Sequence, residues 1–308
     1  MRVAVLNAPR QLEIADAPVP DPGAGEVLLR VANCGVCASE LDMWEGRGAI
    51  EYPRFPGHEV SGTVERVGPG VRSLRPGEPV AAWVTERGLA DYVTARAEHC
   101  FPAGAVPLDL ALAEPLACAV NAVERAAVAL GDDVVIVGAG FMGHLVHKLV
   151  QLKGPRAVTV ADTRADALER AAALGATRTV DVRREPLAGL DADVAFEVTG
   201  VQAGLLAAGD AVRMSGKLVI VGFHRGGSRE IPLGAWNWMA LDIVNAHFRD
   251  PETIMRGMRT GMRLLTSGAL ALDDLVTHRF ALEDVNDAFA VAVEKPDGFV
   301  KASITMED

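Results

Sequence analysis

The spacing of hydrophobic positions along the chain changes near residue 115. Before that point, short apolar segments alternate with polar residues and are separated by glycine and proline, as in residues 26–32 and 59–68. Alternation with a period of two between such turn residues is typical of β-strands. We therefore predict that the first hundred residues form an all-β domain of the barrel or sandwich type.

After residue 115 the pattern predicts helices and strands in alternation. Residues 116–130 are predicted to form a helix that Gly131 ends as a C-cap. Continuous apolar strands separated by helices then predict a parallel sheet that is buried on both faces. The predicted strands of this sheet are 133–138, 157–162, 177–181, 192–200 and 217–223.

The chain ends with an amphipathic helix over 251–268 and a tail of mixed strand and helix. Residues 298–306 are predicted to form a strand whose neighbours are the N-terminal strands. A length of 308 residues favours two domains. We predict a β-rich domain of residues 1–116 and 250–308, and an α/β domain of residues 117–249.

Composition excludes several classes of partner. The net charge of −11 disfavours nucleic acid and anionic membranes, which attract clustered lysine and arginine. No uninterrupted apolar segment is long enough to span a bilayer, and the N-terminus lacks the apolar core of a signal peptide. Four cysteines in a chain of this size do not form a disulfide scaffold. These features favour a cytoplasmic protein with reduced thiols.

A glycine-rich turn marks the start of the α/β domain. Gly138, Gly140 and Gly143 form a G-x-G-x-x-G pattern, with Phe141 and Met142 inside it, between a predicted strand and a predicted helix. This context is typical of a dinucleotide site, because the glycines allow the backbone and the helix N-terminus to approach a pyrophosphate. The alternative is a doubly wound domain with a tight turn and no nucleotide.

The residues at the end of the next predicted strand bear on the choice of nucleotide. Asp162 stands where a carboxylate accepts hydrogen bonds from the adenosine ribose and repels a 2′-phosphate, which favours NAD over NADP. Arg164, two residues later, could accommodate that phosphate. Asp166 and Glu169 nearby offer the arginine competing partners.

A cysteine, a histidine and an acid in the β-rich half could form a zinc site. Cys37, His58 and an acid would supply the sulfur, nitrogen and oxygen ligands that suit zinc, with a fourth position left for water or substrate. Each residue taken alone is as well explained by packing or by a surface position. Cys34 and Cys37 are also spaced as a Cys-x-x-Cys pair, which could be a redox dithiol, half of a structural zinc site or a chance spacing.

Ordered motifs along the whole chain resemble the zinc-dependent medium-chain dehydrogenase/reductase family, and most closely its polyol and threonine dehydrogenase branch. The motifs include CGVCASELDMW, GHEVSGTV, GLADYV, EPLACAV, VVIVGAGFMG, FEVTG, KLVIVGF and GFVKASI. The resemblance implies a GroES-like catalytic domain joined to a Rossmann nucleotide-binding domain, one catalytic zinc, and a nicotinamide cofactor, with NAD preferred.

The resemblance also implies roles for individual residues. Cys37 and His58 match zinc ligands, whereas Cys34 matches a neighbour that does not bind metal. Glu59 and Glu114 are both candidates for the acidic ligand, and the sequence does not rank them. Ser39 matches the start of a proton relay and Lys301 matches a residue that reaches the cofactor. Further candidates at the cofactor are Thr199 and Gly222. Candidates at the substrate are Asp42, Trp44 and His247, and the region of His247 could instead lie at the subunit interface.

Three departures from the family pattern qualify these assignments. Glu40 replaces an aspartate that supports the ligand histidine, and Asp42 replaces a histidine of the proton route, which leaves that route open. The chain also lacks the four-cysteine lobe of many relatives, and Cys100 alone cannot bind a structural zinc. We therefore predict one zinc per chain and no structural zinc.

The reaction implied is the reversible oxidation of a secondary alcohol by hydride transfer, with a polyol, sugar-like or cyclitol-like substrate favoured by the matched branch. Two alternatives are a zinc-free quinone or enone reductase and a nucleotide-binding protein without catalysis. The strand expected near residues 242–248 would form an open sheet edge and pair in a homodimer, and some family members pair dimers into tetramers. His144 and His147 are predicted to lie on a helix surface.

Overall fold

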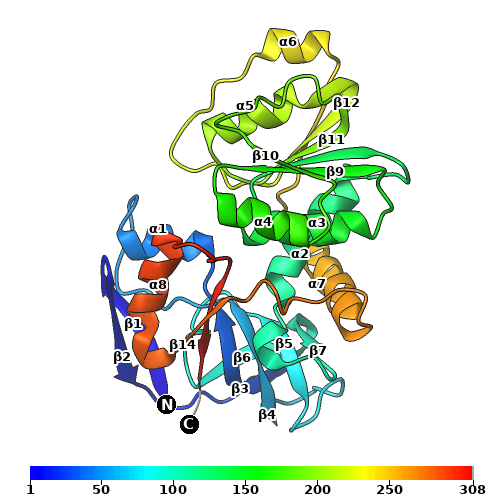
Figure 1. The fold of residues 1–308 in the computed structure, drawn as a ribbon. Coiled ribbons are helices and arrows are strands. Elements are labelled where there is room, and N and C mark those ends of the chain that lie inside the picture. The colour runs from blue at the N-terminus through cyan, green and yellow to red at the C-terminus, as the bar shows by residue number, and fades with distance from the viewer. Residues whose placement is uncertain (307–308) are drawn as a thin grey trace. The chain divides into compact units, whose positions relative to one another are not determined.

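The structure is a computed structural model that describes residues 1–306 and contains two compact units (Figure 1). Unit 1 comprises residues 1–117 and the described residues from 258 onward, and unit 2 comprises residues 118–257. The boundaries fall inside two helices, α2 (Ala113–Ala126) and α7 (Pro251–Thr266). The second boundary therefore lies later than the predicted residue 250.

Unit 1 is built on a seven-stranded sheet in the order β14-β15-β3-β4-β5-β7, with β6 paired to β3, and on a separate hairpin of β1 and β2. Its helices are α1 (Ala38–Glu45) and α8 (Val285–Glu294), with short 3₁₀ turns at 97–99, 108–110 and 282–284. The strands are β1 (Arg2–Ala8), β2 (Gln11–Asp16), β3 (Glu26–Gly35), β4 (Glu59–Val67), β5 (Pro79–Trp83), β6 (Tyr92–Arg96), β7 (Cys100–Pro102), β14 (His278–Ala281) and β15 (Ala302–Thr305).

The C-terminal tail completes the sheet of unit 1. Strand β15 pairs antiparallel with β3, with Ser303 opposite Gly35 and Ile304 opposite Cys34. Helix α8 buries Val285, Phe289 and neighbours spaced three or four residues apart, which is the apolar stripe that a core-facing helix needs. The prediction that the last strand joins the N-terminal strands is confirmed.

Unit 2 contains a six-stranded parallel sheet in the order β10-β9-β8-β11-β12-β13. Figure 1 shows α3 and α4 on one side of this sheet and α5 on the other. The strands are β8 (Asp133–Val137), β9 (Ala157–Asp162), β10 (Arg178–Asp181), β11 (Ala192–Glu197), β12 (Val212–Ile220) and β13 (Asp242–Asn245). The helices are α3 (Phe141–Gln151), α4 (Ala165–Ala173), α5 (Gln202–Asp210) and α6 (Leu233–Trp238).

The strand order of unit 2 locates its ligand-binding edge. After β8 the chain adds β9 and β10 on one side, and then returns to add β11, β12 and β13 on the other. In open parallel sheets, ligands bind beyond the carboxyl ends of the strands where the order reverses, which here is between β8 and β11. Strand β13 lies at the edge of the sheet, as predicted.

Two local predictions were wrong. Helix α2 begins at Ala113 and ends at Ala126, where Ala127 adopts a left-handed conformation with φ 51°, so Gly131 does not cap it. His144 and His147 are completely buried instead of lying on the helix surface. Leu145, Val146 and Leu149 beside them are also buried, so α3 is enclosed on most sides. Burial, together with Lys148, lowers the pKa of His147 to about 4, so its ring is neutral at neutral pH.

Among the described residues, no helix is both long enough and apolar enough to cross a lipid bilayer.

Candidate metal and nucleotide sites

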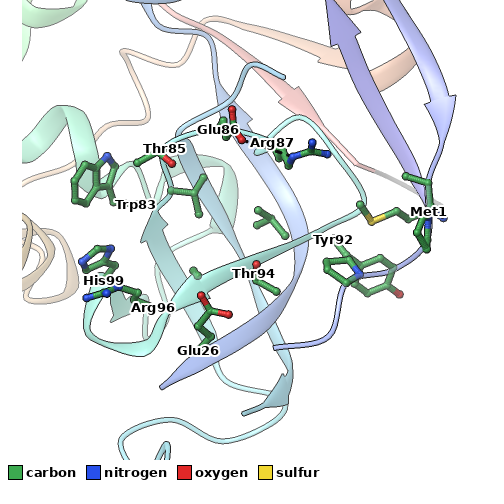
Figure 2. A pocket seen from close by; sticks show the side chains of 16 residues that line it. Met1, Glu26, Trp83, Thr85, Glu86, Arg87, Tyr92, Thr94, Arg96 and His99 are labelled. Atoms are coloured by element: carbon green, nitrogen blue, oxygen red, sulfur yellow. Dashed lines mark hydrogen bonds and ion pairs between the residues drawn. The ribbon is translucent and has the colours of Figure 1, made fainter. Parts of the chain in front are cut away.

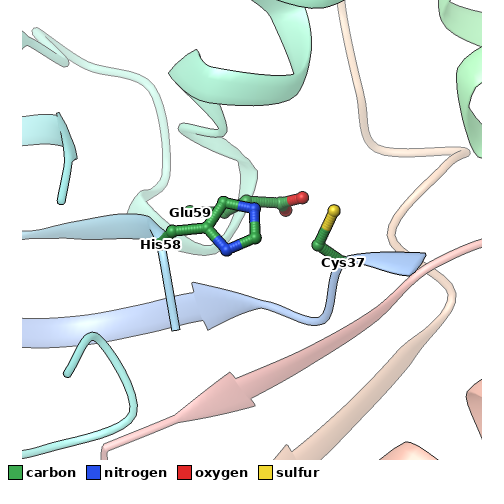
Figure 3. Close-up of side chains that lie close together, drawn as sticks. All are labelled: Cys37, His58 and Glu59. Atoms are coloured by element: carbon green, nitrogen blue, oxygen red, sulfur yellow. The ribbon is translucent and has the colours of Figure 1, made fainter. Parts of the chain in front are cut away.

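Three potential metal ligands meet at one end of the β3–β4 pair in unit 1. Cys37 follows β3 and precedes α1, while His58 and Glu59 stand at the start of β4. Gly35 lies opposite Glu59 in the antiparallel register, so the loops that carry the ligands converge. One ligand atom from each of Cys37, His58 and Glu59 lies within 4.8 Å of the others (Figure 3).

Glu40 of α1 holds the imidazole of His58. Its Oε1 lies 3.0 Å from His58 Nδ1 and accepts a hydrogen bond of 2.6 Å from the backbone N–H of Gly57. A carboxylate at Nδ1 fixes the ring and leaves Nε2 as the basic nitrogen, which is the usual support for a metal-binding histidine. Glu40 thus makes the contact expected from the aspartate that it replaces.

The electrostatics of this pair are strong because both groups are enclosed. Burial alone would lower the pKa of His58, but the carboxylate of Glu40 and the neighbouring Cys37 outweigh it and raise that pKa well above its usual value. Burial would likewise raise the pKa of Glu40, yet His58 and two backbone N–H groups hold it below the ordinary value. The surroundings thus stabilise both a negative carboxylate and a positive charge at His58.

The two cysteines of the Cys-x-x-Cys pair have different environments. Cys37 is partly exposed and accepts a hydrogen bond of 3.3 Å from the hydroxyl of Ser39. Cys34 is completely buried in the core of unit 1, and burial raises its pKa far above the ordinary range, so its thiol stays protonated. The structure therefore assigns Cys37 to the cluster and Cys34 to the core.

A buried ion pair adjoins the metal cluster. The Nζ of Lys301 lies 2.7 and 2.9 Å from the carboxylate oxygens of Glu59, and both side chains are almost fully enclosed. Burial would lower the pKa of Lys301, but Glu59 and Cys37 outweigh it and raise that pKa. The sequence did not predict this pair, and the role of Lys301 at the cofactor stays a prediction.

The donor set fits a zinc ion. Cys37, His58 and Glu59 supply sulfur, nitrogen and oxygen, which is a ligand combination typical of zinc with an open position. Glu59 is a buried carboxylate beside Cys37 and His58, so a dication held by these three ligands would offset negative charge that is costly to bury. Glu114, in the first turn of α2, acts electrostatically on Lys301 but is not part of the three-residue cluster.

The glycine-rich turn of unit 2 has the geometry of a phosphate cradle. Gly138 has φ 108°, and a Cβ there would lie 2.9 Å from the Thr199 side chain. A Cβ on Gly143 would lie 1.8 Å from the carbonyl oxygen of Gly138, so only glycine lets α3 pack this closely. Gly140, the N-cap of α3, has open space around it. The exposed backbone and helix N-terminus suit a pyrophosphate.

Asp162 joins this turn to the end of β9. Its Oδ2 accepts a hydrogen bond of 2.6 Å from the N–H of Ala139, and its Oδ1 accepts bonds from the N–H groups of Thr163 and Arg164. The guanidinium of Arg164 lies 3.7 Å from Asp166, which is the competing partner expected from the sequence. The carboxylate therefore stands at the carboxyl edge of the sheet with its position fixed by the backbone.

The remaining predicted residues of unit 2 share that edge. Gly222 follows β12 and packs so closely on Gly200 that a Cβ would lie 2.2 Å from the Gly200 nitrogen. His247 follows β13, and its Nε2 lies 3.2 Å from the carbonyl oxygen of Gly222. Thr199 follows β11. The contact of His247 with substrate stays a prediction.

Trp44 does not match its predicted place on a substrate wall. Its side chain is only 4% exposed, its ring centroid lies 5.9 Å from that of Phe289, and its Nε1 donates to Asn286. It packs in the core because α1 presents its apolar side to α8. Asp42 lies on α1 and forms an ion pair of 3.2 Å with Arg47, and its role at the substrate stays a prediction.

A cavity of about 530 Å³ lies elsewhere in unit 1 (Figure 2). It is lined along β5 and β6 by side chains that include Trp83, Tyr92, Arg96 and His99. None of the residues that line it belongs to the metal cluster or to the other predicted site residues.

Comparison with known proteins finds two matching families and several relatives. Residues 23–107 match the alcohol dehydrogenase GroES-like domain, and residues 142–259 match the zinc-binding dehydrogenase family. Sorbitol dehydrogenase of Gallus gallus is 32% identical, over 92% of this chain and 91% of its own.

Two solved structures share the fold. One is galactitol-1-phosphate dehydrogenase of Escherichia coli, with a TM-score of 0.86 and 22% identity over 99% of this chain and 100% of its own. The other is a putative zinc-binding dehydrogenase of Sinorhizobium meliloti bound to NADP, with a TM-score of 0.87 and 24% identity over 99% of both chains.

The fold and the matched families define an oxidoreductase with a GroES-like unit and a Rossmann unit. The chain belongs to the zinc-dependent medium-chain dehydrogenase/reductase family, and within it to the polyol dehydrogenase-like group.

Proposed function

We propose that this protein is a zinc-dependent, NAD-linked dehydrogenase that interconverts a secondary alcohol and its ketone. The observation that carries the proposal is the convergence of Cys37, His58 and Glu59 within 4.8 Å, in a chain that also has a glycine-rich nucleotide turn. A zinc-free reductase would not need this ligand set, and a protein without catalysis would not need an open metal position.

The residues of unit 1 would hold the metal and the alcohol. When bound, zinc supplies Lewis acidity that lowers the proton affinity of an alcohol oxygen. Cys37, His58 and Glu59 would hold the ion, and Glu40 would keep the imidazole of His58 in the orientation and tautomer that ligation requires. Lys301 fixes the carboxylate of Glu59 and offsets its charge.

The proton of the alcohol would leave through Ser39. Its hydroxyl is exposed and lies 3.3 Å from Cys37 Sγ, so it stands beside the metal position and in contact with solvent. Asp42 lies on the same helix, in the position where relatives carry a histidine, and would receive or release the proton at the surface. The residues of unit 2 would bind and orient the nucleotide, which would supply the hydride acceptor.

The substrate that we propose is a polyol or a sugar-like or cyclitol-like alcohol. The similarity to sorbitol dehydrogenase and the fold shared with galactitol-1-phosphate dehydrogenase support this class. A screen of polyols, cyclitols, amino sugars and simple secondary alcohols, followed by the absorbance of reduced nucleotide, tests it. Activity confined to conjugated ketones or quinones, without any alcohol, would contradict the proposal.

The proposed cofactor is NAD. We expect kcat/KM to be at least tenfold higher with NAD than with NADP, about 1.4 kcal/mol, because a 2′-phosphate would face the carboxylate of Asp162. Asp162→Asn keeps an oxygen acceptor for the N–H groups of Thr163 and Arg164, loses the one for Ala139 and removes the charge, so the ratio should fall mainly through better use of NADP. Asp166→Ala, which removes the ion-pair partner of Arg164, should shift the ratio in the same direction. A wild type that prefers NADP would show that Arg164 dominates.

We propose a homodimer formed through the open edge at β13. Ile243 on this strand and Trp238 on α6 are exposed apolar residues, at 40% and 81%. Pairing of two β13 strands across a two-fold axis would satisfy their free backbone groups. We expect a dimer at micromolar concentration by light scattering and a monomer for Ile243→Glu, with Ile14→Glu on β2 as the matched control. A monomeric wild type would refute the claim.

A further inference from the structure

A buried acid lies beneath the loops at the carboxyl ends of β11 and β12 in unit 2. Glu197, the last residue of β11, has no exposed surface. Its Oε1 accepts hydrogen bonds of 2.7 and 2.8 Å from the backbone N–H groups of Thr199 and Gly200. A buried carboxylate is costly unless its charge is compensated. Its other oxygen, Oε2, therefore needs a hydrogen-bond partner that is itself bonded to a positively charged group.

That partner is His224, in the loop that follows β12. Its Nε2 lies 2.8 Å from Glu197 Oε2, and its Nδ1 lies 3.1 Å from Nε of Arg229. An arginine can only donate, so Nδ1 must be the acceptor and the ring must carry its proton on Nε2. His224 therefore donates from Nε2 to Glu197 and accepts at Nδ1 from Arg229, which links the buried carboxylate to the guanidinium.

Arg229 connects the rest of the loop after β12 to the turn after β11. Its Nη2 donates to the carbonyl oxygen of Arg225 at 2.7 Å and to that of Gly200 at 3.3 Å. These two hydrogen bonds hold the loop after β12 against the turn after β11. Phe223, at the exposed tip, lies between the ring of His247 at 5.4 Å and the guanidinium of Arg225 at 4.6 Å.

The position of this network defines its role if unit 2 binds a dinucleotide, as proposed above. The glycine turn after β8 would take the pyrophosphate, and Asp162 after β9 would take the adenosine half. The nicotinamide half then extends to the opposite side of the switch point, over the ends of β11 and β12. The backbone there is the segment that Glu197, His224 and Arg229 hold together.

We propose that Glu197, His224 and Arg229 form a latch that positions the nicotinamide-side backbone of the nucleotide site. The three are positioning residues, because they act through the turn at 199–200 and the loop at 222–229. The latch requires of the side chain at position 224 one hydrogen-bond donor toward Glu197 and one acceptor toward Arg229.

The test compares two ligands of full-length protein by isothermal titration calorimetry. NADH spans both halves of the site, whereas ADP occupies only the adenosine and pyrophosphate side. His224→Ala should raise the dissociation constant of NADH about tenfold and change that of ADP less than twofold. His224→Gln, whose amide offers a donor and an acceptor, should stay within threefold of wild type for NADH. His99→Ala in unit 1 is the control for loss of a histidine.

The arginine is tested by a double-mutant cycle. Arg229→Leu should weaken NADH about as much as His224→Ala does, and the double variant should be no weaker than either single variant. Additive losses of NADH affinity in the double variant would overturn the latch. It would also be overturned if His224→Ala bound NADH as tightly as wild type, or if its affinities for NADH and ADP fell equally. A wild type that binds neither NADH nor ADP would instead overturn the proposed function, and the latch with it.

Discussion

Cys37→Ala is expected to lower kcat/KM for alcohol oxidation by about a thousandfold or more. The substitution removes the sulfur ligand, and Lewis-acid stabilisation of a developing alkoxide is worth several kcal/mol, of which about 4 correspond to a thousandfold in rate. Nucleotide binding should be unchanged, because Cys37 lies in unit 1 and the glycine turn in unit 2. Steady-state kinetics measures the loss of activity, metal analysis measures the loss of bound zinc, and titration with NADH measures nucleotide binding.

Cys34→Ala is the matched control for that variant. Its thiol is buried in the core and donates a hydrogen bond of 3.7 Å to the carbonyl oxygen of Gly35. Activity and bound zinc should therefore stay near the wild-type level, with a modest loss of stability from the small cavity. Full activity in Cys37→Ala, or loss of zinc only in Cys34→Ala, would show that the two cysteines have been assigned in the wrong order.

Glu40→Ala is expected to raise the dissociation constant for zinc by about 10- to 100-fold, the usual effect of removing the partner of a ligand histidine. The variant frees the ring of His58 and leaves the buried N–H of Gly57 without its acceptor. Glu40→Asp restores the residue usual in the family and should recover most of the affinity. Competition with a chromophoric chelator measures it.

A loss of stability has to be separated from a loss of zinc affinity in this variant. An orphaned buried N–H costs about 1–3 kcal/mol, so the melting temperature of the metal-free protein should also fall. The exposed Glu51→Ala serves as the control for removal of an acid. Zinc affinity equal to wild type in Glu40→Ala would contradict the supporting role of this carboxylate.

The sequence predicted the sheet of unit 2 well because its strands carry continuous apolar residues. The glycine pattern between the first strand and the following helix is also typical of this kind of sheet. A side chain at Gly143 would place its Cβ 1.8 Å from the carbonyl oxygen of Gly138, a contact that no residue other than glycine avoids. The strand over residues 302–305 was also predictable, because its apolar alternation needs partners in the β-rich half. Local pattern and tertiary contacts agree in these elements.

The end of helix α2 was not predictable in the same way. Residues 127–130 remain apolar and helix-compatible, yet the helix stops at Ala126 and Ala127 turns left-handed. The approach of the chain to β8 decides this end, and no residue in the local sequence marks it. The burial of His144 and His147 has the same origin, since it depends on how completely neighbouring elements cover α3.

The residues of the candidate metal site could be predicted from the sequence, but the interactions among them could not. Cys37, His58 and Glu59 could be proposed from motif order, and Glu40 from its place in the motif. The ion pair between Glu59 and Lys301 joins residues 242 positions apart and follows from the pairing of β15 with β3. Glu197 lies inside the FEVTG motif and His224 directly follows KLVIVGF, but neither was assigned a role, although a charged residue at the end of an apolar strand was the available signal.

A dehydrogenase that works with one zinc ion per chain should carry that ion when it is purified and lose activity without it. The most direct measurement is the zinc content of freshly purified protein by inductively coupled plasma mass spectrometry, with alcohol-dependent reduction of NAD assayed before chelation, after chelation and after zinc is restored. We predict one zinc per chain, loss of activity on chelation with nucleotide binding retained, and recovery with zinc. Alcohol oxidation at full rate in protein without zinc would contradict zinc-dependent catalysis.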